Sequence, residues 1–119
     1  MTENKNLDTF NEETDDISKL PSSFVYNLTR SVNYNGTEFK SLDLDFSKLT
    51  GKDAREIKNE LTSLNINVII PTFSDEYLIR VICKASKEKI GADFLDLASM
   101  YDYNKLIARA KAFLLKAEL

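Results

Sequence analysis

The sequence contains no histidine, and Cys83 is its only cysteine. Without histidine the chain lacks the commonest general base and the commonest metal ligand of proteins. A single cysteine excludes an intrachain disulfide and a thiolate metal cluster. The sequence also has no glycine-rich phosphate loop, no zinc-ligand spacing and no nucleophile elbow. We therefore expect no catalytic residue, no metal site and no cofactor, and we predict that the chain is not an enzyme.

Long apolar runs are missing as well. No run approaches the ~18 residues that a membrane span requires, and the N-terminus is polar and acidic, unlike a signal peptide. These observations predict a cytoplasmic protein without membrane contact. The net charge of −3 and the sequence pI near 5.0 argue against a nucleic-acid partner, because nucleic-acid-binding domains usually have a basic footprint.

Most of the negative charge lies at the N-terminus. Residues 1–20 carry six acidic and two basic side chains, so the rest of the chain is close to neutral. The N-terminal region also has few apolar side chains, a composition typical of disorder. The alternative is a segment that folds on contact with a partner, with Phe10 and Ile17 as anchors. We predict a disordered acidic head over residues 1–22 and one folded domain over residues 23–119.

The folded part begins with a β-hairpin. Apolar residues alternate from Phe24 to Tyr34, and Asn35-Gly36 is the strongest short signal for a two-residue hairpin turn. Beyond the turn, the apolar residues of the second strand change from odd to even positions. We therefore predict a β-bulge in the second strand near Lys40-Ser41. The predicted pairs are Tyr34 with Thr37, Val32 with Phe39, Leu28 with Leu44 and Tyr26 with Phe46.

Two helices are expected in the middle of the chain. Thr50-Gly51-Lys52-Asp53 is a capping box that opens a helix ending near Leu64-Asn65. The β-branched run 65–71 is either a short strand or a buried extended linker, because Pro71 prevents a helix from continuing into it. Thr72 or Ser74 then caps a second helix, which ends before Gly91.

The last quarter of the chain has the clearest helical period. A short helical turn is expected over residues 93–97, and Ser99-Met100-Tyr101-Asp102 is a capping box that opens the final helix. One apolar stripe runs along this helix. Its members are Tyr103, Leu106, Ile107, Ala110, Phe113 and Leu114. The predicted fold is therefore α+β, with an N-terminal antiparallel β-hairpin packed on three to four α-helices.

Few polar residues are candidates for chemistry. Asp93, Asp96 and Asp102 could be imagined as metal ligands, but helix caps and first-turn positions account for Asp93 and Asp102 without a metal. Cys83 lies on a predicted helix and has no histidine to activate it, so we interpret it as a core thiol rather than a nucleophile.

Six short sequence motifs follow one another in a particular order and spacing over residues 28–115. They are the hairpin Leu28 to Leu44 around Tyr34-Asn35-Gly36-Thr37-Glu38-Phe39; Leu49-Thr50-Gly51-Lys52-Asp53-Ala54-Arg55-Glu56; Leu64-Asn65-Ile66-Asn67-Val68; Pro71-Thr72-Phe73-Ser74-Asp75-Glu76-Tyr77-Leu78; Leu95 to Met100 with Asp102-Tyr103; and Ala112-Phe113-Leu114. In these features the sequence resembles the phage tail assembly chaperones, the family that includes tail assembly proteins of Mu-like and related contractile-tailed phages and prophages.

The resemblance implies a non-catalytic role in virion assembly. Proteins of this family coat the tape measure protein, keep it soluble and help tail tube subunits to polymerise around it. They are absent from the finished tail. The implied partners are therefore the tape measure protein and the major tail tube protein, and the implied location is the cytoplasm of the host cell.

A tape measure protein is long, helical and apolar, so its partner must cover apolar stripes reversibly. Helix-in-groove binding is suited to this task. We predict that the contact is formed by Leu78 and Ile82 on the second helix and by Tyr101 and Leu115 on the last helix. We expect at most weak homo-oligomerisation, because the acidic head limits self-association.

Two alternatives remain open. Two capped helices separated by a short turn can mimic a helix-turn-helix, so the chain could be a small phage regulatory or DNA-associated protein. Its phosphate contacts would then be Lys84, Lys87, Lys89, Arg109 and Lys111, and its binding to random duplex DNA would weaken steeply with salt. The chain could also be a component of the mature tail, which mass spectrometry of purified particles would reveal.

Overall fold

The computed structural model describes residues 20–116, and it has the α+β fold that the sequence predicts. The elements are the strands β1 (Ser23–Tyr34) and β2 (Thr37–Asp45), and the helices α1 (Gly51–Ser63), α2 (Asp75–Ala85), α3 (Ala92–Leu97) and α4 (Met100–Lys116). Two short 3-10 turns, Phe46–Lys48 and Pro71–Phe73, precede α1 and α2.

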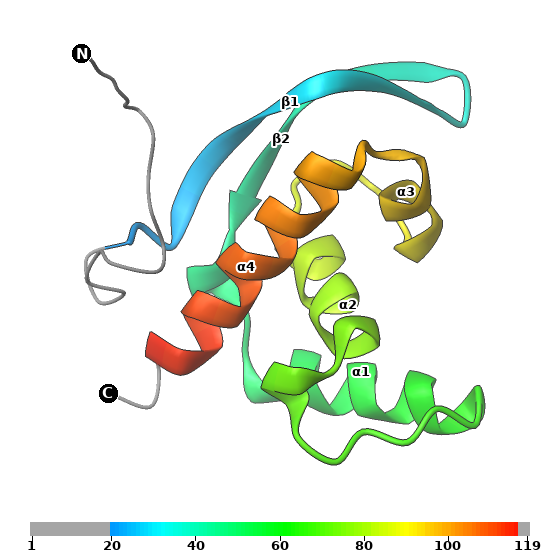
Figure 1. Ribbon diagram of the computed structural model, residues 1–119. Coiled ribbons are helices and arrows are strands. Elements are labelled where there is room, and N and C mark those ends of the chain that lie inside the picture. The colour runs from blue at the N-terminus through cyan, green and yellow to red at the C-terminus, as the bar shows by residue number, and fades with distance from the viewer. Residues whose placement is uncertain (1–19, 117–119) are drawn as a thin grey trace.

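The two strands form a long curved ribbon that arches over α4 and α3 (Figure 1). Helix α2 is central, because it contacts the other three helices and β2. Helix α1 packs against α2 on the side away from the ribbon (Figure 1). Among residues 20–116, helices therefore cover one face of the sheet only.

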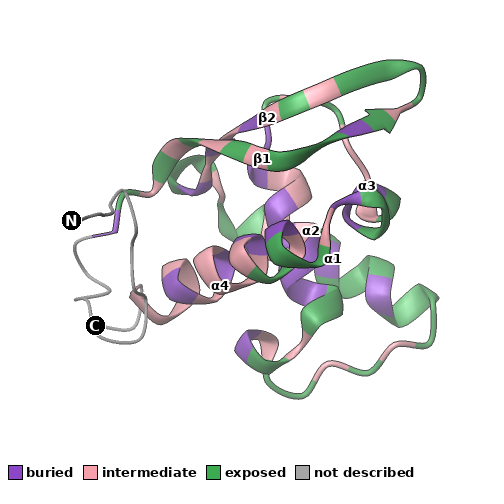
Figure 2. Ribbon diagram, turned by 45° about the horizontal axis from the view of Figure 1, so that its top comes forward, coloured by how far each residue is buried: buried purple, intermediate pink, exposed green. Residues whose placement is uncertain are grey.

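The core lies where α2 and α4 meet beneath the ribbon, as the buried positions in Figure 2 show. The stripe predicted for the last helix is confirmed: Leu106 and Ala110 are fully buried, and its other members are partly buried against the same core. Beneath the N-terminal half of the ribbon, Phe46 stacks on Phe113 with ring centroids 5.3 Å apart.

The hairpin turn is as predicted, with Tyr34 opposite Thr37 and Val32 opposite Phe39. Asn35 and Gly36 have φ values of 52° and 83°, the left-handed conformation that a type I′ turn requires at both positions. Glycine adopts this conformation without steric cost, and asparagine tolerates it better than most residues do.

The predicted bulge lies in the wrong strand. Five steps along β1, from Asn27 to Val32, face only two steps along β2, from Ser41 to Phe39. The extra residues therefore belong to β1, and they lie at the level of the sheet where the sequence placed the irregularity. The register beyond the bulge differs accordingly from the prediction: Tyr26 pairs with Leu42, and Phe24 pairs with Leu44.

The helix caps follow the sequence closely. The carboxylate of Asp53 accepts a hydrogen bond from the Thr50 backbone N–H at 2.8 Å, as expected of the capping box, and a further one from the Thr50 hydroxyl at 3.3 Å. Ser74 rather than Thr72 caps α2, because its hydroxyl oxygen accepts from the Tyr77 N–H at 3.2 Å. Thr72 is buried instead.

Helix α3 is attached to the hairpin tip by one tyrosine. The Tyr34 hydroxyl donates to Asp93 Oδ1 (2.7 Å) and accepts from the Gly91 backbone N–H (3.1 Å). The rings of Tyr34, Phe39 and Phe94 also meet edge to face, and both Tyr34 and Phe39 lie about 5 Å from Phe94, in the favoured range for aromatic pairs. A short helix is thereby fixed to the far end of the ribbon.

Candidate partner-binding surface

Two of the four predicted partner residues are fully buried. Leu78 and Ile82 are both 0% exposed. The prediction placed them at a surface, and it is wrong for a physical reason: α2 is enclosed by α1, α3, α4 and β2, so nearly all of its faces are buried. Leu115 is half-buried, and Tyr101 is exposed.

Exposed apolar side chains gather instead on the connection between α1 and α2. Ile69 is 83% exposed, Phe73 is 75% exposed and Ile70 is also exposed. These three residues, together with Asn67 and Ser74, line an open concavity of about 430 Å³. We call Ile69, Ile70 and Phe73 the 69–73 patch. Isolated exposed apolar residues are ordinary, whereas a contiguous group around a hollow is typical of an interaction surface.

The local backbone explains why these residues point outward. Asn65, with φ of 61°, reverses the chain after α1, and the connection that follows is not a strand. Ile66 and Val68 turn inward and pack on the core, so this connection resembles the predicted extended linker in part. Pro71 then begins a 3-10 turn that buries Thr72. Ile70, just before this turn, and Phe73, at its end, remain exposed.

A lysine of α4 lies next to the 69–73 patch. The Nζ atom of Lys111 is 5.6 Å from the centre of the Phe73 ring, a distance typical of a cation–π contact. The aliphatic stem of a lysine can extend an apolar surface while its charge remains in water.

A second group of exposed apolar residues lies where α3 meets α4. It consists of Leu97, Met100 and Tyr101, each of which is more than half exposed. Lys105 lies 5.7 Å from the centre of the Tyr101 ring. Tyr101 is the predicted partner residue that the structure leaves most accessible.

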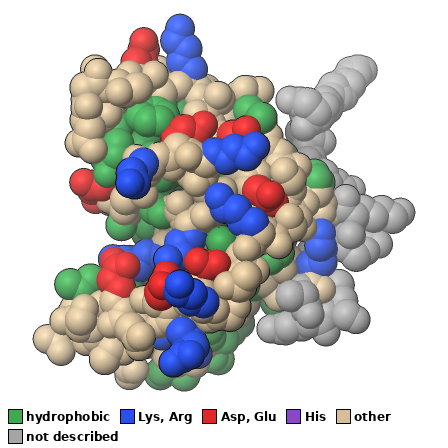
Figure 3. Space-filling model, turned by 180° about the vertical axis from the view of Figure 1, so that it is seen from behind, with side chains coloured by type: hydrophobic (Ala, Val, Ile, Leu, Met, Phe, Trp, Pro, Cys, Tyr) green, Lys and Arg blue, Asp and Glu red, His purple; other side chains and the backbone are tan. Residues whose placement is uncertain are grey.

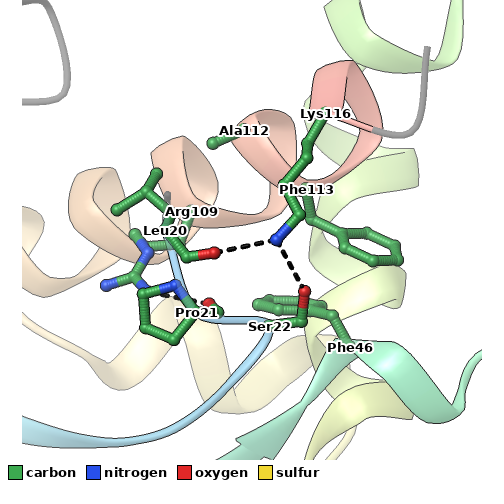
Figure 4. A pocket seen from close by; sticks show the side chains of 8 residues that line it. All are labelled: Leu20, Pro21, Ser22, Phe46, Arg109, Ala112, Phe113 and Lys116. Atoms are coloured by element: carbon green, nitrogen blue, oxygen red, sulfur yellow. Dashed lines mark hydrogen bonds between the residues drawn. The ribbon is translucent and has the colours of Figure 1, made fainter. Parts of the chain in front are cut away.

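Residues 20–22 form a strap across the C-terminal half of α4 (Figure 4). The Lys116 ammonium donates to the Leu20 carbonyl (2.8 Å) and the Ser22 hydroxyl (3.0 Å). Arg109 donates to the Pro21 carbonyl at 3.2 Å, and its guanidinium stacks on the Phe24 ring at 3.8 Å. Leu20 is buried. Residues 20–22, which lie before the predicted boundary at residue 23, therefore pack against α4, while residues 1–19 of the predicted head lie outside the described residues.

The most deeply buried charged group is Asp102 in the first turn of α4. Its carboxylate accepts from the Tyr26 hydroxyl (2.8 Å), the Thr29 backbone N–H (2.9 Å) and the Thr29 hydroxyl (3.0 Å). Its own N–H donates to Ser99 Oγ at 3.1 Å. The predicted serine cap is therefore present, but the aspartate binds the β1 bulge rather than completing a capping box.

Hydrogen bonding keeps the buried Asp102 charged. Burial acts to raise the pKa of this carboxyl, but the hydrogen bonds from Tyr26, Thr29 and Ser99 favour the ionised form. Together they lower the pKa below the usual value for aspartate. The sequence assigned Asp102 to a cap, and no local pattern indicated that its partners would lie more than seventy residues earlier.

Other titratable groups have ordinary structural roles. Burial raises the pKa of the Cys83 thiol to about 12, which leaves it protonated at neutral pH. Arg80 binds Glu60 and Glu76, and Lys84 binds Glu56 and lies near Asp53. In Figure 3, basic and acidic side chains alternate across one face of the molecule.

The five basic residues named for the helix-turn-helix alternative have separate contacts in the structure. Lys84 binds acids of α1, and Lys87 lies 3.4 Å from Asp43 of β2. Arg109 holds the strap and Lys111 covers Phe73, while Lys89 is exposed after α2. These residues do not form one basic face.

Within residues 20–116, no group of three or more histidine, cysteine or acidic side chains is arranged to hold a metal ion. No helix in the same range has both the length and the hydropathy of a membrane span. Comparison of the chain with protein-family models, curated proteins and solved structures found no match.

Proposed function

We propose that this chain is a non-catalytic phage tail assembly chaperone that binds the tape measure protein through the 69–73 patch. The proposal rests on the family resemblance of residues 28–115 and on one structural observation, the exposed apolar concavity formed by that patch. In this role the chain keeps the tape measure protein soluble in the host cytoplasm, promotes polymerisation of the tail tube protein around it, and is absent from the mature virion.

The shape and chemistry of the patch suit a transient contact with an amphipathic helix. Isoleucine and phenylalanine offer a large apolar area, and an open concavity can receive successive side chains on one face of a helix. The patch is small compared with the interfaces of permanent complexes, which bury several thousand Å². A small apolar contact repeated by many chaperone copies along a long partner would keep it soluble and still allow release.

Co-expression with the tape measure protein tests the proposal. The wild-type chain is expected to raise the soluble fraction of the tape measure protein and to be recovered with it. The double variant Ile69→Asp/Phe73→Asp should lose both effects, because it places charges in the apolar contact.

Val25→Asp provides the matched control, since Val25 is also exposed and apolar but lies on β1. This variant should behave like the wild type. Equal recovery of soluble tape measure protein with and without the chaperone would refute the proposed function. Equal loss with both variants would refute the role of the patch.

A further inference from the structure

An apolar pocket lies where α1, α2 and α4 meet, and it shares no lining residue with the 69–73 patch. Its volume is about 110 Å³, and its apolar walls include Ala54 and Ile57 of α1, Val81 of α2, and Phe113 and Leu114 of α4. Pockets for small-molecule ligands usually measure ~300–1,000 Å³, whereas an apolar cavity of ~150 Å³ holds one benzene ring. This pocket, which we call the α1–α4 pocket, therefore has room for one large side chain.

One polar group that lines the pocket is buried without a partner. Tyr77 of α2 is only 5% exposed, and its hydroxyl has no hydrogen-bond partner among residues 20–116. Burial raises the pKa of this phenol. The other polar lining residues, Thr50 and Asp53, bond to each other. Because buried tyrosine hydroxyls are normally paired, an occupant that matches the pocket is apolar and brings one hydrogen-bond acceptor.

Methionine meets both requirements. Its side chain is apolar and its thioether sulfur is an acceptor, whereas leucine, isoleucine and phenylalanine side chains have no acceptor. A tyrosine would also accept, but it brings a further donor that itself needs a partner. Methionine sulfur makes favourable contacts with aromatic rings, and Tyr77 and Phe113 place two such rings at the pocket.

The one methionine within residues 20–116 lies at the other end of α4 from the pocket. Met100 begins α4 and is 79% exposed, and its neighbours Leu97 and Tyr101 are also more than half exposed. Phe113 lies in the last turn of the same helix, so ~20 Å of helix separates Met100 from the pocket. Figure 1 shows α3 beside one end of α4 and the C-terminus beyond the other end. A chain therefore cannot place Met100 in its own pocket.

We propose that Met100 of one copy inserts into the α1–α4 pocket of a second copy, where its thioether sulfur accepts from the Tyr77 hydroxyl. Leu97 and Tyr101 of the first copy then cover the surface around the pocket. The two contacting surfaces differ, so the contact joins copies head to tail. The interface is small, and the association is therefore weak. This inference concerns two copies of the same chain and does not depend on the partner proposed above.

Sedimentation velocity of the full-length chain over about 0.05–2 mM tests the contact, because weak contacts are populated in this range. The wild type should be a monomer of 13.6 kDa at the lowest concentration, and its average mass should rise with concentration. Met100→Asp should abolish the rise because it places a charge in the apolar contact. Ala54→Leu should abolish it because the larger side chain fills the pocket. Val25→Asp, the same type of change at an exposed residue of β1, should associate like the wild type.

A mixture of the two deficient variants distinguishes head-to-tail contact from other modes of association. Met100→Asp retains the pocket and Ala54→Leu retains Met100, so together they should form a one-to-one complex of twice the monomer mass and nothing larger. Circular dichroism verifies that both variants keep the fold. The proposal is wrong if the wild type stays monomeric at every concentration, if Met100→Asp associates like the wild type, or if the mixture forms no complex.

Tyr77→Phe tests the hydrogen bond within the contact. This variant keeps the aromatic wall of the pocket but removes the hydroxyl, and it should weaken the association by about twofold or more. Unchanged association would contradict the bond between the Tyr77 hydroxyl and the Met100 sulfur.

Discussion

Asp102 shows how one side chain can hold distant parts of the molecule together. The residue is fully buried, yet three donors from Tyr26 and Thr29 satisfy its carboxylate. Its position in the first turn of α4 adds the favourable field of the helix N-terminus. A buried charge is costly unless all of its hydrogen bonds are made. Disturbing this carboxylate should therefore cost more stability than disturbing an apolar contact of similar size.

Replacing Asp102 by asparagine should therefore destabilise the fold. An asparagine side chain retains one acceptor but turns an NH₂ group toward the donors of Tyr26 and Thr29. The expected loss in the free energy of unfolding is about 2–3 kcal/mol, measured by urea denaturation followed by circular dichroism. Asp96→Asn is the control, because Asp96 is exposed on α3, and it should change stability by less than about 0.5 kcal/mol.

The contribution of Asp102 should also depend on pH. Its pKa is lowered in the folded state, so its stabilising effect is fully present above the unfolded pKa of about 4 and is lost as the pH falls through the folded pKa. The stability difference between the wild type and Asp102→Asn should be constant from pH 7 to about pH 5 and should shrink below pH 4. A difference that grows on acidification would contradict the assignment.

Cys83 should be unreactive in the native protein. Burial raises its pKa to about 12, and the thiolate is the reactive form. At pH 8 a thiol reagent such as a disulfide dye should react with the native protein at least about a hundredfold more slowly than with the urea-unfolded chain. Equal rates in the two states would show that the thiol is accessible.

At the level of elements, the enclosure of α2 gives very different burial to residues that have similar sequence patterns. Leu78 and Phe73 are both large apolar residues near the start of α2, yet one is fully buried and the other is exposed. Leu78→Ala should cost about 2–5 kcal/mol because it leaves a cavity in the core. Phe73→Ala should change stability by less than about 0.5 kcal/mol. Thermal or urea unfolding of the two variants gives the comparison.

Helix α3 offers a second test at this scale. Tyr34→Phe keeps the aromatic contacts with Phe39 and Phe94 but removes the hydrogen bonds to Asp93 and Gly91. The backbone amides at the start of α3 should then exchange with solvent roughly fivefold faster. Tyr101→Phe removes an exposed hydroxyl elsewhere and should leave these exchange rates unchanged.

Local signals predicted most elements, because caps and turns act over a few residues. Thr50, Ser74 and Asn35-Gly36 each have side chains or backbone preferences that specify their own surroundings. The side of the bulge and the role of Asp102 could not be predicted in this way. Both depend on a contact between β1 and α4, and a period of apolar residues carries no information about which distant element satisfies a buried polar group.

At the scale of the whole molecule, the prediction from the sequence underestimated how fully α2 is surrounded by other elements. It also did not identify the 69–73 patch. Residues 66–70 are apolar except for Asn67, and this composition gives no indication of which members face the core. The structure divides it, with Ile66 and Val68 against the core and Ile69 and Ile70 exposed. The candidate partner surface follows from this division, which only the packed fold determines.

A dye that binds exposed apolar surface can detect the 69–73 patch in the intact protein. Ile69→Asp/Phe73→Asp should bind less of an anilinonaphthalene dye than the wild type while retaining the same circular dichroism spectrum. Val25→Asp should change dye binding much less, because Val25 does not line the concavity. Unchanged dye binding in the double variant would show that the patch is not the main apolar surface.

The bond between Asp102 and the β1 bulge also has a consequence for synthesis of the chain on the ribosome. Thr29 is made early, but the Asp102 carboxylate that accepts from its backbone N–H is not made until more than seventy further residues have been added. The nascent hairpin can therefore form its turn soon after synthesis but lacks the contact that fixes its bulge until the last helix leaves the exit tunnel. The bulge of β1 is therefore fixed only after α4 has been synthesised.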